Sequence, residues 1–477
     1  MVSKFLIGAV IYFATSAQAA GPIGGITGLN PKIDTSIVSI PAPPSDWKKY
    51  PYYPVQSKIE FPKDEGRHKW NSALEWWYVV MHVTGETTGN EYSVLVTHFS
   101  NGYRFFDVTN ITNKTHVSGT TKGKWNAHEG FLDVTQITPY GADTMRTKRD
   151  EKGQLIPFEY EMHTHHSEME LRAEVKALKA PFMVGGDGLV QIGTSGWSWY
   201  YSQTRMEARG VLTYKGITES ISGIAWMDHQ WGPFLISPVQ LGGVFESYEW
   251  FCLQLDNNTE LMTSNIYDRS NRLPQTSAYG GVGIVNPDGS VDGIVKRTYI
   301  HKRYWQDPVE KIYMSMGWQL IVPEWQMDLT ITPKFEDQIV RFPFKGSFWE
   351  GAASVTGTLR GVAVSGKAFG ELMHHFQLPK IAVGALNKTY SADELIALKW
   401  NIKNPDDGNP LHYRLDLIGN GTVTKLVDRL RIPEWKFRMR DLLPADLAQG
   451  EFMVKISAFS EDKVITSSRD SDFFVIK

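Results

Sequence analysis

The amino-acid sequence predicts an all-β protein. Many short segments alternate apolar and polar residues, and clusters of Gly, Asn, Asp and Thr separate them at intervals of about ten residues. Few stretches have the 3.6-residue period of an amphipathic helix. Aromatic residues make up 12% of the 477 residues and include 16 Trp, a residue that packs well in β-sheets and around apolar ligands. We therefore expect sandwiches or barrels.

The N-terminus has the features of a secretory signal peptide over residues 1–19. Lys4 supplies the positive charge, residues 5–14 contain a short apolar run, and Ala17-Gln18-Ala19 forms a small-x-small cleavage site. The apolar run is too short to span ~30 Å of hydrocarbon. We expect cleavage after Ala19, a secreted or periplasmic location, and no transmembrane segment in the mature chain.

The rest of the chain divides into four expected regions. Residues 20–55 are rich in Gly, Pro and Ser and read as an irregular leader. Two runs of strands follow, 56–236 and 237–377, with glycine-containing turns at their junction near residues 233–244. Residues 382–477 alternate in the manner of an immunoglobulin or fibronectin-type β-sandwich, for which we expect a role in stability or in docking to a protein or a surface.

Composition excludes several classes of function. The formal net charge is -3 at pH 7 and no long basic run is present, so we expect no nucleic-acid partner. Cys252 is the only cysteine, so core burial must stabilise the fold without an intramolecular disulfide. There is no Gly-x-Ser-x-Gly motif of an α/β-hydrolase, and the glycines at 185–188 form a turn with no helix start after it. We expect no cofactor.

Four motifs follow one another within residues 56–377. They are Ser72-Ala73-Leu74-Glu75-Trp76-Trp77-Tyr78, Trp199-Tyr200-Tyr201-Ser202-Gln203-Thr204-Arg205, Gly223-Ile224-Ala225-Trp226-Met227-Asp228-His229-Gln230-Trp231-Gly232, and Phe348-Trp349-Glu350-Gly351 with Gly366-Lys367-Ala368-Phe369-Gly370-Glu371-Leu372. Together they resemble the lipocalin-like family of AttH, carotenoid hydratase (hydroxyneurosporene synthase) and kievitone hydratase. The resemblance implies two lipocalin-like antiparallel β-barrel halves that meet at an apolar ligand site. Relatives often have Glu at Gln230, and Thr-Gly-Tyr where this chain has Met373-His374-His375.

The resemblance also implies a class of reaction. Carotenoid and kievitone hydratases add water to a prenyl-type double bond, and related fungal proteins direct ring closures. We therefore expect a hydro-lyase (alkene hydratase) or a cyclase that uses acid catalysis on an apolar isoprenoid- or polyketide-like molecule. Family membership does not fix the reaction, and a non-catalytic carrier of an apolar ligand is the alternative. An acid that faces the ligand distinguishes the enzyme from the carrier.

The alternation of side chains between the two faces of a strand, which we call strand parity, selects the first candidate site residues. In an extended segment His229 and Trp231 share one face, whereas Trp226 and Asp228 share the other. His229 is the preferred acid, because an imidazolium donates a proton near neutral pH. Trp231 would stabilise a carbocation against its ring face, and the resemblance to carotenoid hydratase favours the same pair. The alternative is that His229 is a structural hydrogen-bonding group that closes the first barrel.

The other catalytic candidates are carboxylates. Asp268 follows Tyr267 at a strand end, where the resemblance to carotenoid hydratases implies a functional Tyr and Asp, with a turn-forming Asp as the alternative; Glu249 stands between Tyr248 and Trp250. We expect His229 and Trp231 to face an apolar cavity between the two halves, with Asp268 or Glu249 opposite. Glu75 is a further candidate, either a buried acid with a raised pKa or a satisfied acceptor at the barrel rim. Further ligand-binding candidates are Trp77, Tyr248 and Tyr267.

A histidine-rich segment raises the question of a metal site. His163 and His165 would share a strand face, and His166 follows them. No third ligand with convincing spacing accompanies these residues along the sequence, so we expect no metal site.

Overall fold

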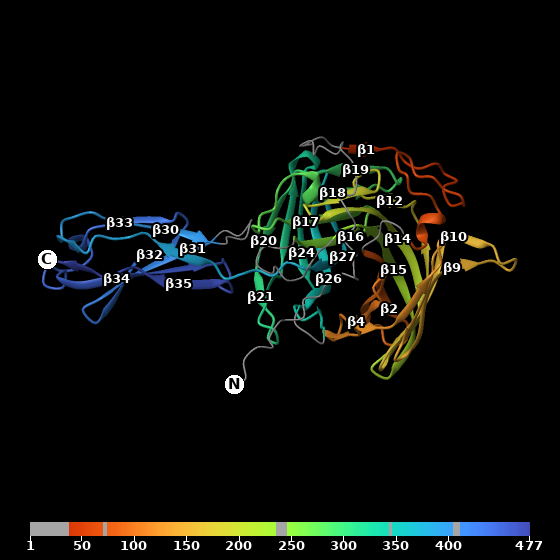
Figure 1. The fold of residues 1–477 in the computed structure, drawn as a ribbon, viewed down its shortest axis with the longest axis horizontal. Helices are drawn as coiled ribbons and strands as arrows, with labels where there is room; N and C mark the ends of the chain where they lie inside the picture. The colour runs from red at the N-terminus through yellow and green to blue at the C-terminus, as the bar shows by residue number, and fades with distance from the viewer. Residues whose placement is uncertain (1–37, 70–73, 235–245, 343–345, 404–410) are drawn as a thin grey trace, which may run out of the picture. The chain divides into compact units, whose positions relative to one another are not determined.

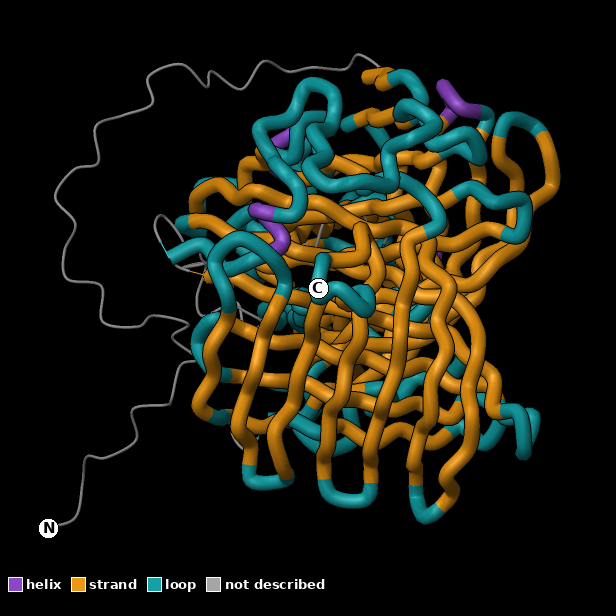
Figure 2. The backbone as a smooth tube through the Cα atoms, turned by 90° about the vertical axis from the view of Figure 1, so that its right-hand side faces the viewer, coloured by secondary structure: helices purple, strands orange, loops and turns teal. Residues whose placement is uncertain are grey.

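The computed structural model describes residues 38–69, 74–234, 246–342, 346–403 and 411–477. These residues form β-strands and four short 3-10 turns, with no α-helix among them (Figures 1 and 2). The all-β prediction is therefore confirmed. In this part of the chain, no helix has the length and apolar character that crossing a membrane requires. The expected signal peptide and most of the expected junction at 233–244 lie outside the described residues.

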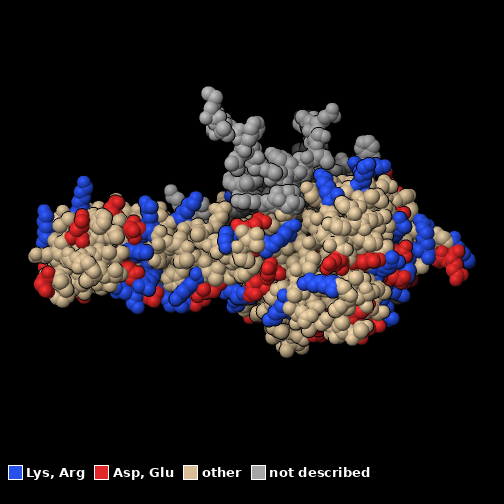
Figure 3. Space-filling model, turned by 90° about the horizontal axis from the view of Figure 1, so that it is seen from below, with Lys and Arg blue, Asp and Glu red and all other residues tan. Residues whose placement is uncertain are grey.

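The chain forms two compact units. The first comprises the described residues within 38–269, 273–298 and 320–374, and the second comprises those within 270–272, 299–319 and 375–477. Lys and Arg side chains are interspersed with Asp and Glu on the face that Figure 3 shows.

The N-terminal half of the first unit is one curled antiparallel sheet. Its strand order is β5-β4-β3-β2-β15-β14-β11-β10-β9-β8-β7. The bounds are β2 Leu74–Gly85, β3 Glu91–Phe99, β4 Tyr103–Asn110, β5 Thr115–Ser118, β7 Lys124–Ala127, β8 Asp133–Thr138, β9 Gly141–Arg149, β10 Leu155–His166, β11 Met169–Ala177, β14 Gly196–Tyr214 and β15 Ile217–Gly232. Alternate residues of β2, such as Trp77 and Val79, are buried in the concave core of this half.

The C-terminal half of the first unit is a second curled sheet. Its strands lie in the order β1-β19-β18-β17-β16-β27-β26-β24-β23. The bounds are β1 Val38–Ile40, β16 Ser247–Leu255, β17 Glu260–Tyr267, β18 Gly280–Val285, β19 Val291–Ile294, β23 Trp318–Val322, β24 Met327–Pro333, β26 Phe348–Leu359 and β27 Val362–Leu372. Part of the expected irregular leader is thus ordered, because β1 pairs with β19.

The two half-barrels pack face to face through one apolar cluster. Tyr78 and Trp226 of the N-terminal half contact Trp250 of the C-terminal half, with ring centroids 5.8 and 6.2 Å apart. The cluster also contains Val80 and Phe369. The two-half architecture predicted from the four motifs is therefore confirmed.

A fully buried ion pair lies inside the N-terminal half. Arg104 Nε is 2.8 Å from Asp143 Oδ2, and both side chains are 0% exposed. The guanidinium also donates hydrogen bonds to the backbone carbonyls of Gly119 and His165. These contacts join β4 to β9 and β10, so the pair closes the open side of the curled sheet.

The second unit contains the C-terminal strands. One sheet has the order β29-β36-β34-β31-β32 and another has the order β28-β30-β33. The bounds are β28 Lys380–Val383, β29 Thr389–Tyr390, β30 Ile396–Lys403, β31 His412–Gly419, β32 Thr422–Leu430, β33 Glu434–Phe437, β34 Gly450–Phe459 and β36 Phe474–Ile476. Leu398, Leu415 and Val454 from both sheets share one core. The immunoglobulin or fibronectin-type assignment of this region stays a prediction.

Candidate functional site

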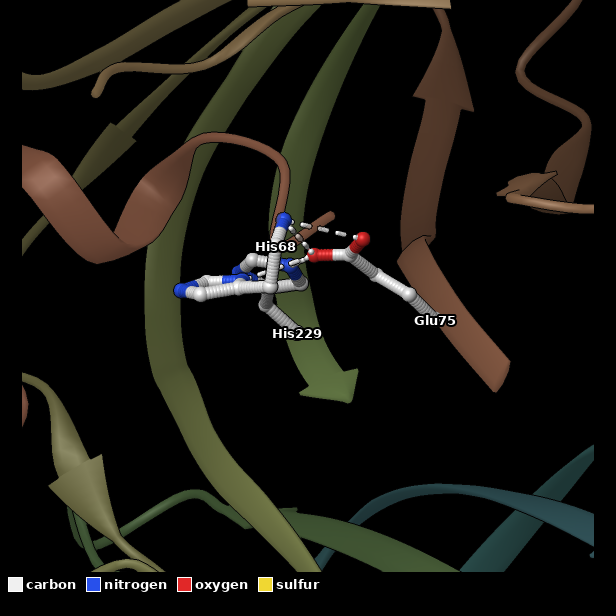
Figure 4. Close-up of side chains that lie close together, drawn as sticks. All are labelled: His68, Glu75 and His229. Carbon is white, nitrogen blue, oxygen red and sulfur yellow. Dashed lines mark hydrogen bonds and ion pairs between the residues drawn. The ribbon is translucent and has the colours of Figure 1, made fainter. Parts of the chain in front are cut away.

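A cluster of titratable side chains lies inside the N-terminal half, and we call Asp64, His68, Glu75 and His229 the histidine cluster. His68 and His229 both point toward Glu75 (Figure 4). Glu75 Oε1 is 2.8 Å from His68 Nδ1 and 3.1 Å from His229 Nε2. The second nitrogen of each ring is bonded to Asp64, His68 Nε2 to the carboxylate at 3.2 Å and His229 Nδ1 to the backbone carbonyl at 3.0 Å.

Aromatic rings hold the two imidazoles. Trp77 stacks on His229 at a centroid distance of 4.9 Å, and His68 stacks on Trp231 at 3.9 Å with an interplanar angle of 2°. Tyr201 meets His229 edge-on at 5.5 Å. The structure thus brings together four of the sequence-predicted site residues: Glu75, Trp77, His229 and Trp231.

The position of this cluster differs from the expected cavity between the halves. His229 and Trp231 do share a face, as parity predicted, but that face belongs to the interior of the N-terminal half. The opposite face of β15, which carries Trp226 and Asp228, is the one directed at the C-terminal half. Sequence parity defined the two faces, but only the packing of the sheets shows which face meets the other half.

The remaining predicted residues lie in the C-terminal half. Tyr267 Oη donates a hydrogen bond to Glu249 Oε2 at 3.0 Å, and the Tyr267 ring stacks on His374 at 3.8 Å. Asp268 is half-buried directly after β17. Glu249 is thus bonded to Tyr267 within the C-terminal half, and the predicted catalytic roles of Glu249 and Asp268 stay predictions.

Electrostatics make His229 a poor proton donor, unlike His68. Burial opposes the charge of His68, but hydrogen bonds to Asp64 and Glu75 outweigh it and raise its pKa. Burial lowers the pKa of His229, so its imidazolium form is disfavoured at neutral pH. Burial opposes the charge of Glu75, but hydrogen bonds from His229 and His68 outweigh it and hold the pKa of Glu75 below its ordinary value. Glu75 is thus an ionised acceptor rather than an acid.

A second group of carboxyls lies between the two half-barrels. Glu350 of β26 and Glu371 of β27 are directly opposite each other in the sheet register, and we call them the glutamate pair. Tyr78 Oη, from the N-terminal half, donates to Glu350 Oε2 at 3.1 Å. Tyr248, a predicted ligand-binding residue, donates to Glu371 Oε1 at 2.5 Å. Asp228 faces the same region and accepts hydrogen bonds from Tyr200 and Trp226, each at 2.7 Å.

Burial raises the pKa of each of these carboxyls toward neutral pH. It raises the pKa of Glu371 to about 7 and that of Asp228 to about 6. The pKa of Glu350 lies well above its ordinary value, because burial and then the charge of Glu371 both disfavour its ionised form. Two adjacent acids in apolar surroundings do not both ionise, so one of the pair is a proton donor while the other accepts.

Sequence reasoning missed the glutamate pair, although a signal was present. Both residues stand inside recognised motifs, Phe348-Trp349-Glu350-Gly351 and Phe369-Gly370-Glu371-Leu372. A carboxylate within an apolar strand is expensive to bury unless it has a role or a partner. His68 and Asp64 were missed because they precede the first motif, in and after the 3-10 turn Lys63–Glu65.

The raised pKa of Glu371 predicts a contribution to stability that falls with rising pH. The pKa of Glu371 is 4.5 ordinarily and about 7 in the folded protein, so between these values the folded state binds more protons than the unfolded state. The contribution of the protonated Glu371 to the free energy of unfolding is fully present below pH 4.5 and is lost as pH rises through about 7. Burial lowers the pKa of His82 and His116, and their contribution to stability rises with pH in this range. The contribution of Glu371 is therefore measured as the difference between the wild type and a Glu371 variant in how far the urea midpoint falls from about pH 5 to about pH 8.

Glu371→Gln should weaken this pH dependence, whereas Glu174→Gln, at a carboxylate that is 62% exposed, should leave it unchanged. Equal pH dependence in the wild type and in Glu371→Gln would contradict a raised pKa for Glu371.

Two groups in the described part of the chain combine two histidines with one carboxylate at metal-binding distances. One is His68, Glu75 and His229. The other is His163, His165 and Glu170, where Glu170 lies directly opposite His165 on the neighbouring strand and its Oε1 is 2.9 Å from His163 Nε2. The sequence analysis found no third ligand because Glu170 reaches the histidines across a hairpin.

A family model described as AttH-like matches residues 53–374 of this chain. A solved structure of a protein provisionally assigned as AttH from Nitrosomonas europaea has a TM-score of 0.52, 19% identity, and coverage of 68% of this chain and 98% of its own. Kievitone hydratase from Nectria haematococca has a TM-score of 0.50, 18% identity and the same coverage. No curated protein matches the sequence significantly. At these identities the structural likeness shows the lipocalin-like fold alone.

Proposed function

The chain belongs to the AttH-like family, and from this premise we propose that it is an enzyme that adds water to an alkene of an apolar isoprenoid- or polyketide-like molecule. The likeness to kievitone hydratase supports the hydratase class. The observation that carries the proposal is the glutamate pair, because alkene hydration needs a proton donor, and a carboxylic acid that keeps its proton in apolar surroundings can supply that proton.

The surroundings of the pair suit an apolar substrate. Trp250 lies beside Glu371 in the sheet register, and Tyr78 and Trp226 present their rings to Trp250. These ring faces stabilise a carbocation. The indole N–H of Trp250 is buried and has no acceptor among the described residues, so a hydroxyl oxygen on the ligand would satisfy it.

The proposed reaction needs only the two carboxyls and water. The Glu350 carboxyl donates its proton to one alkene carbon, the alkene π electrons form the new C–H bond, and a carbocation remains on the other carbon. Water adds its lone pair to the cation and releases a proton to the Glu371 carboxylate. Proton transfer from Glu371 to Glu350 restores the starting state.

Isotope labelling tests this proposal against its alternatives. The mature protein would be incubated with prenylated phenols and acyclic isoprenoids in H₂¹⁸O, and separately in D₂O, with mass spectrometry of the products. A hydratase gives a product that gains one ¹⁸O and one carbon-bound deuterium. A cyclised product with deuterium but no ¹⁸O indicates a cyclase, and tight binding without any product indicates a carrier; either result overturns the proposal of hydration.

Export is a second part of the proposal, and it follows from the signal-peptide pattern of residues 1–19. Expression of the full chain in a bacterium with a secretory pathway should yield a protein outside the cytoplasm whose N-terminal residue is Ala20. N-terminal sequencing checks this, and an intact Met1 in the cytoplasmic fraction would contradict it.

A further inference from the structure

The histidine cluster has a bonding pattern that is typical of metal-binding histidines. Each imidazole directs one nitrogen at the same oxygen, Glu75 Oε1 (Figure 4). The other nitrogen of each imidazole is bonded to Asp64. Histidines that bind metals show this arrangement, because a carboxylate or carbonyl holds the far nitrogen and fixes the tautomer that presents a lone pair to the ion. One residue, Asp64, serves both rings.

The three inward atoms also have the required spacing. His68 Nδ1, Glu75 Oε1 and His229 Nε2 all lie within 4.8 Å of one another. Tetrahedral zinc with bonds of ~2.0–2.1 Å separates its ligand atoms by ~3.4 Å. The nitrogen–oxygen distances of 2.8 and 3.1 Å therefore need to widen by only ~0.3–0.6 Å to accept the ion.

From this geometry we propose that His68 Nδ1, Glu75 Oε1 and His229 Nε2 bind one divalent transition-metal ion, with zinc as the ion that the ligand set fits. Imidazole is a ligand of borderline softness, so the two histidines favour zinc over magnesium or calcium, and two histidines with one glutamate form a ligand set of zinc sites. Three protein ligands leave a fourth position for water or another small ligand. This site lies in the N-terminal half and is separate from the glutamate pair.

The site has a route of entry and a structural consequence. Glu75 and His229 are 0% exposed, whereas the His68 side chain is 19% exposed, so the ion would arrive on the His68 side. His68 belongs to the segment that follows the 3-10 turn Lys63–Glu65, Glu75 to β2 and His229 to β15. A bound ion would therefore join three separate parts of the chain.

The second two-histidine group provides the matched control. His163 and His165 lie on β10 and are partly exposed, and Glu170 there also accepts a hydrogen bond from Arg172. His163→Ala removes one ligand from that group and none from the proposed site. If the metal binds instead to the partly exposed group of His163, His165 and Glu170, His163→Ala would lose the metal and variants of the histidine cluster would keep it.

The experiment measures metal content and affinity in the full-length protein. After dialysis against trace zinc, plasma mass spectrometry should give about one zinc per wild-type chain and per His163→Ala chain, and much less for His68→Asn. His68→Asn is the main variant because His68 is partly exposed; circular dichroism checks that it is folded. Asp64→Asn keeps all three ligands and should weaken zinc binding by ~10–100-fold in calorimetry.

Cobalt substitution provides a readout that a purely structural role of these side chains would not produce. Cobalt added to the zinc-free wild type should give the intense visible bands of four-coordinate Co²⁺, and His68→Asn should not. Wild-type protein that takes up neither zinc nor cobalt, or uptake that only His163→Ala removes, would overturn the proposal. In that case protons, and not an ion, bridge Glu75 to the two imidazoles.

Discussion

Replacement of Glu350 by Gln is expected to lower product formation by ~10²–10⁴-fold while ligand affinity stays within a few-fold of the wild type. Gln keeps the shape of the side chain and can still bond to Tyr78, whose hydroxyl is 3.1 Å from Glu350 in the wild type. It has no acidic proton to give to an alkene. Steady-state turnover with the best substrate from isotope labelling, together with Trp fluorescence for ligand binding, separates the two effects.

Glu65→Gln is the matched control for this variant. Glu65 is fully buried, burial raises its pKa to about 7, and Tyr50 and Tyr160 each donate a hydrogen bond to it at 2.7 Å. It differs from Glu350 in lying inside the N-terminal half, where its substitution should leave turnover almost unchanged. If Glu350→Gln retains full turnover and His229→Asn abolishes it, the acid is the histidine that the sequence motif predicted.

The largest expected loss of stability follows the replacement of Arg104 by Met. Among the described residues, Asp143 would then keep only its contacts with His165, a backbone N–H at 2.9 Å and a ring nitrogen at 3.2 Å. Removal of one partner of a buried ion pair costs ~3–5 kcal/mol. Met fills most of the volume of the arginine stem, so the loss would come from the charge rather than from a cavity. The free energy of unfolding from urea titration measures the effect.

Two further variants check the cause of that loss. Arg146→Met removes an exposed partner of Asp133, where the side chains are 43% and 38% exposed, and should cost only ~0–1 kcal/mol. The double variant Arg104→Met/Asp143→Leu removes both charges and should recover much of the lost stability. A double variant no more stable than Arg104→Met alone would show that packing, and not charge burial, determines the cost.

The sequence predicted the architecture of the first unit well, because strands and turns are determined by residues that are close together in the chain. Alternation and turn residues define strands, and the parity that groups His229 with Trp231 is correct. The site was predicted less well. The glutamate pair depends on the register between β26 and β27, and the histidine cluster depends on where the segment before β2 folds back. Both arrangements depend on contacts between residues that are far apart in the sequence, and neither the periodicity nor the spacing of residues along the chain predicts such contacts.

Strand β2 divides two chemically different compartments with a single layer of backbone. Trp77 and Tyr78 are neighbours in the chain, yet Trp77 stacks on His229 on one side and Tyr78 bonds to Glu350 on the other. Substitutions on opposite faces of such a wall share no partners, so their energetic effects should add. A single-residue deletion in β2 is different, because it would exchange the side chains of the two compartments. Substitutions can therefore change the residues of one compartment during evolution without affecting the other. The length of β2 cannot change in this way, because both compartments depend on it.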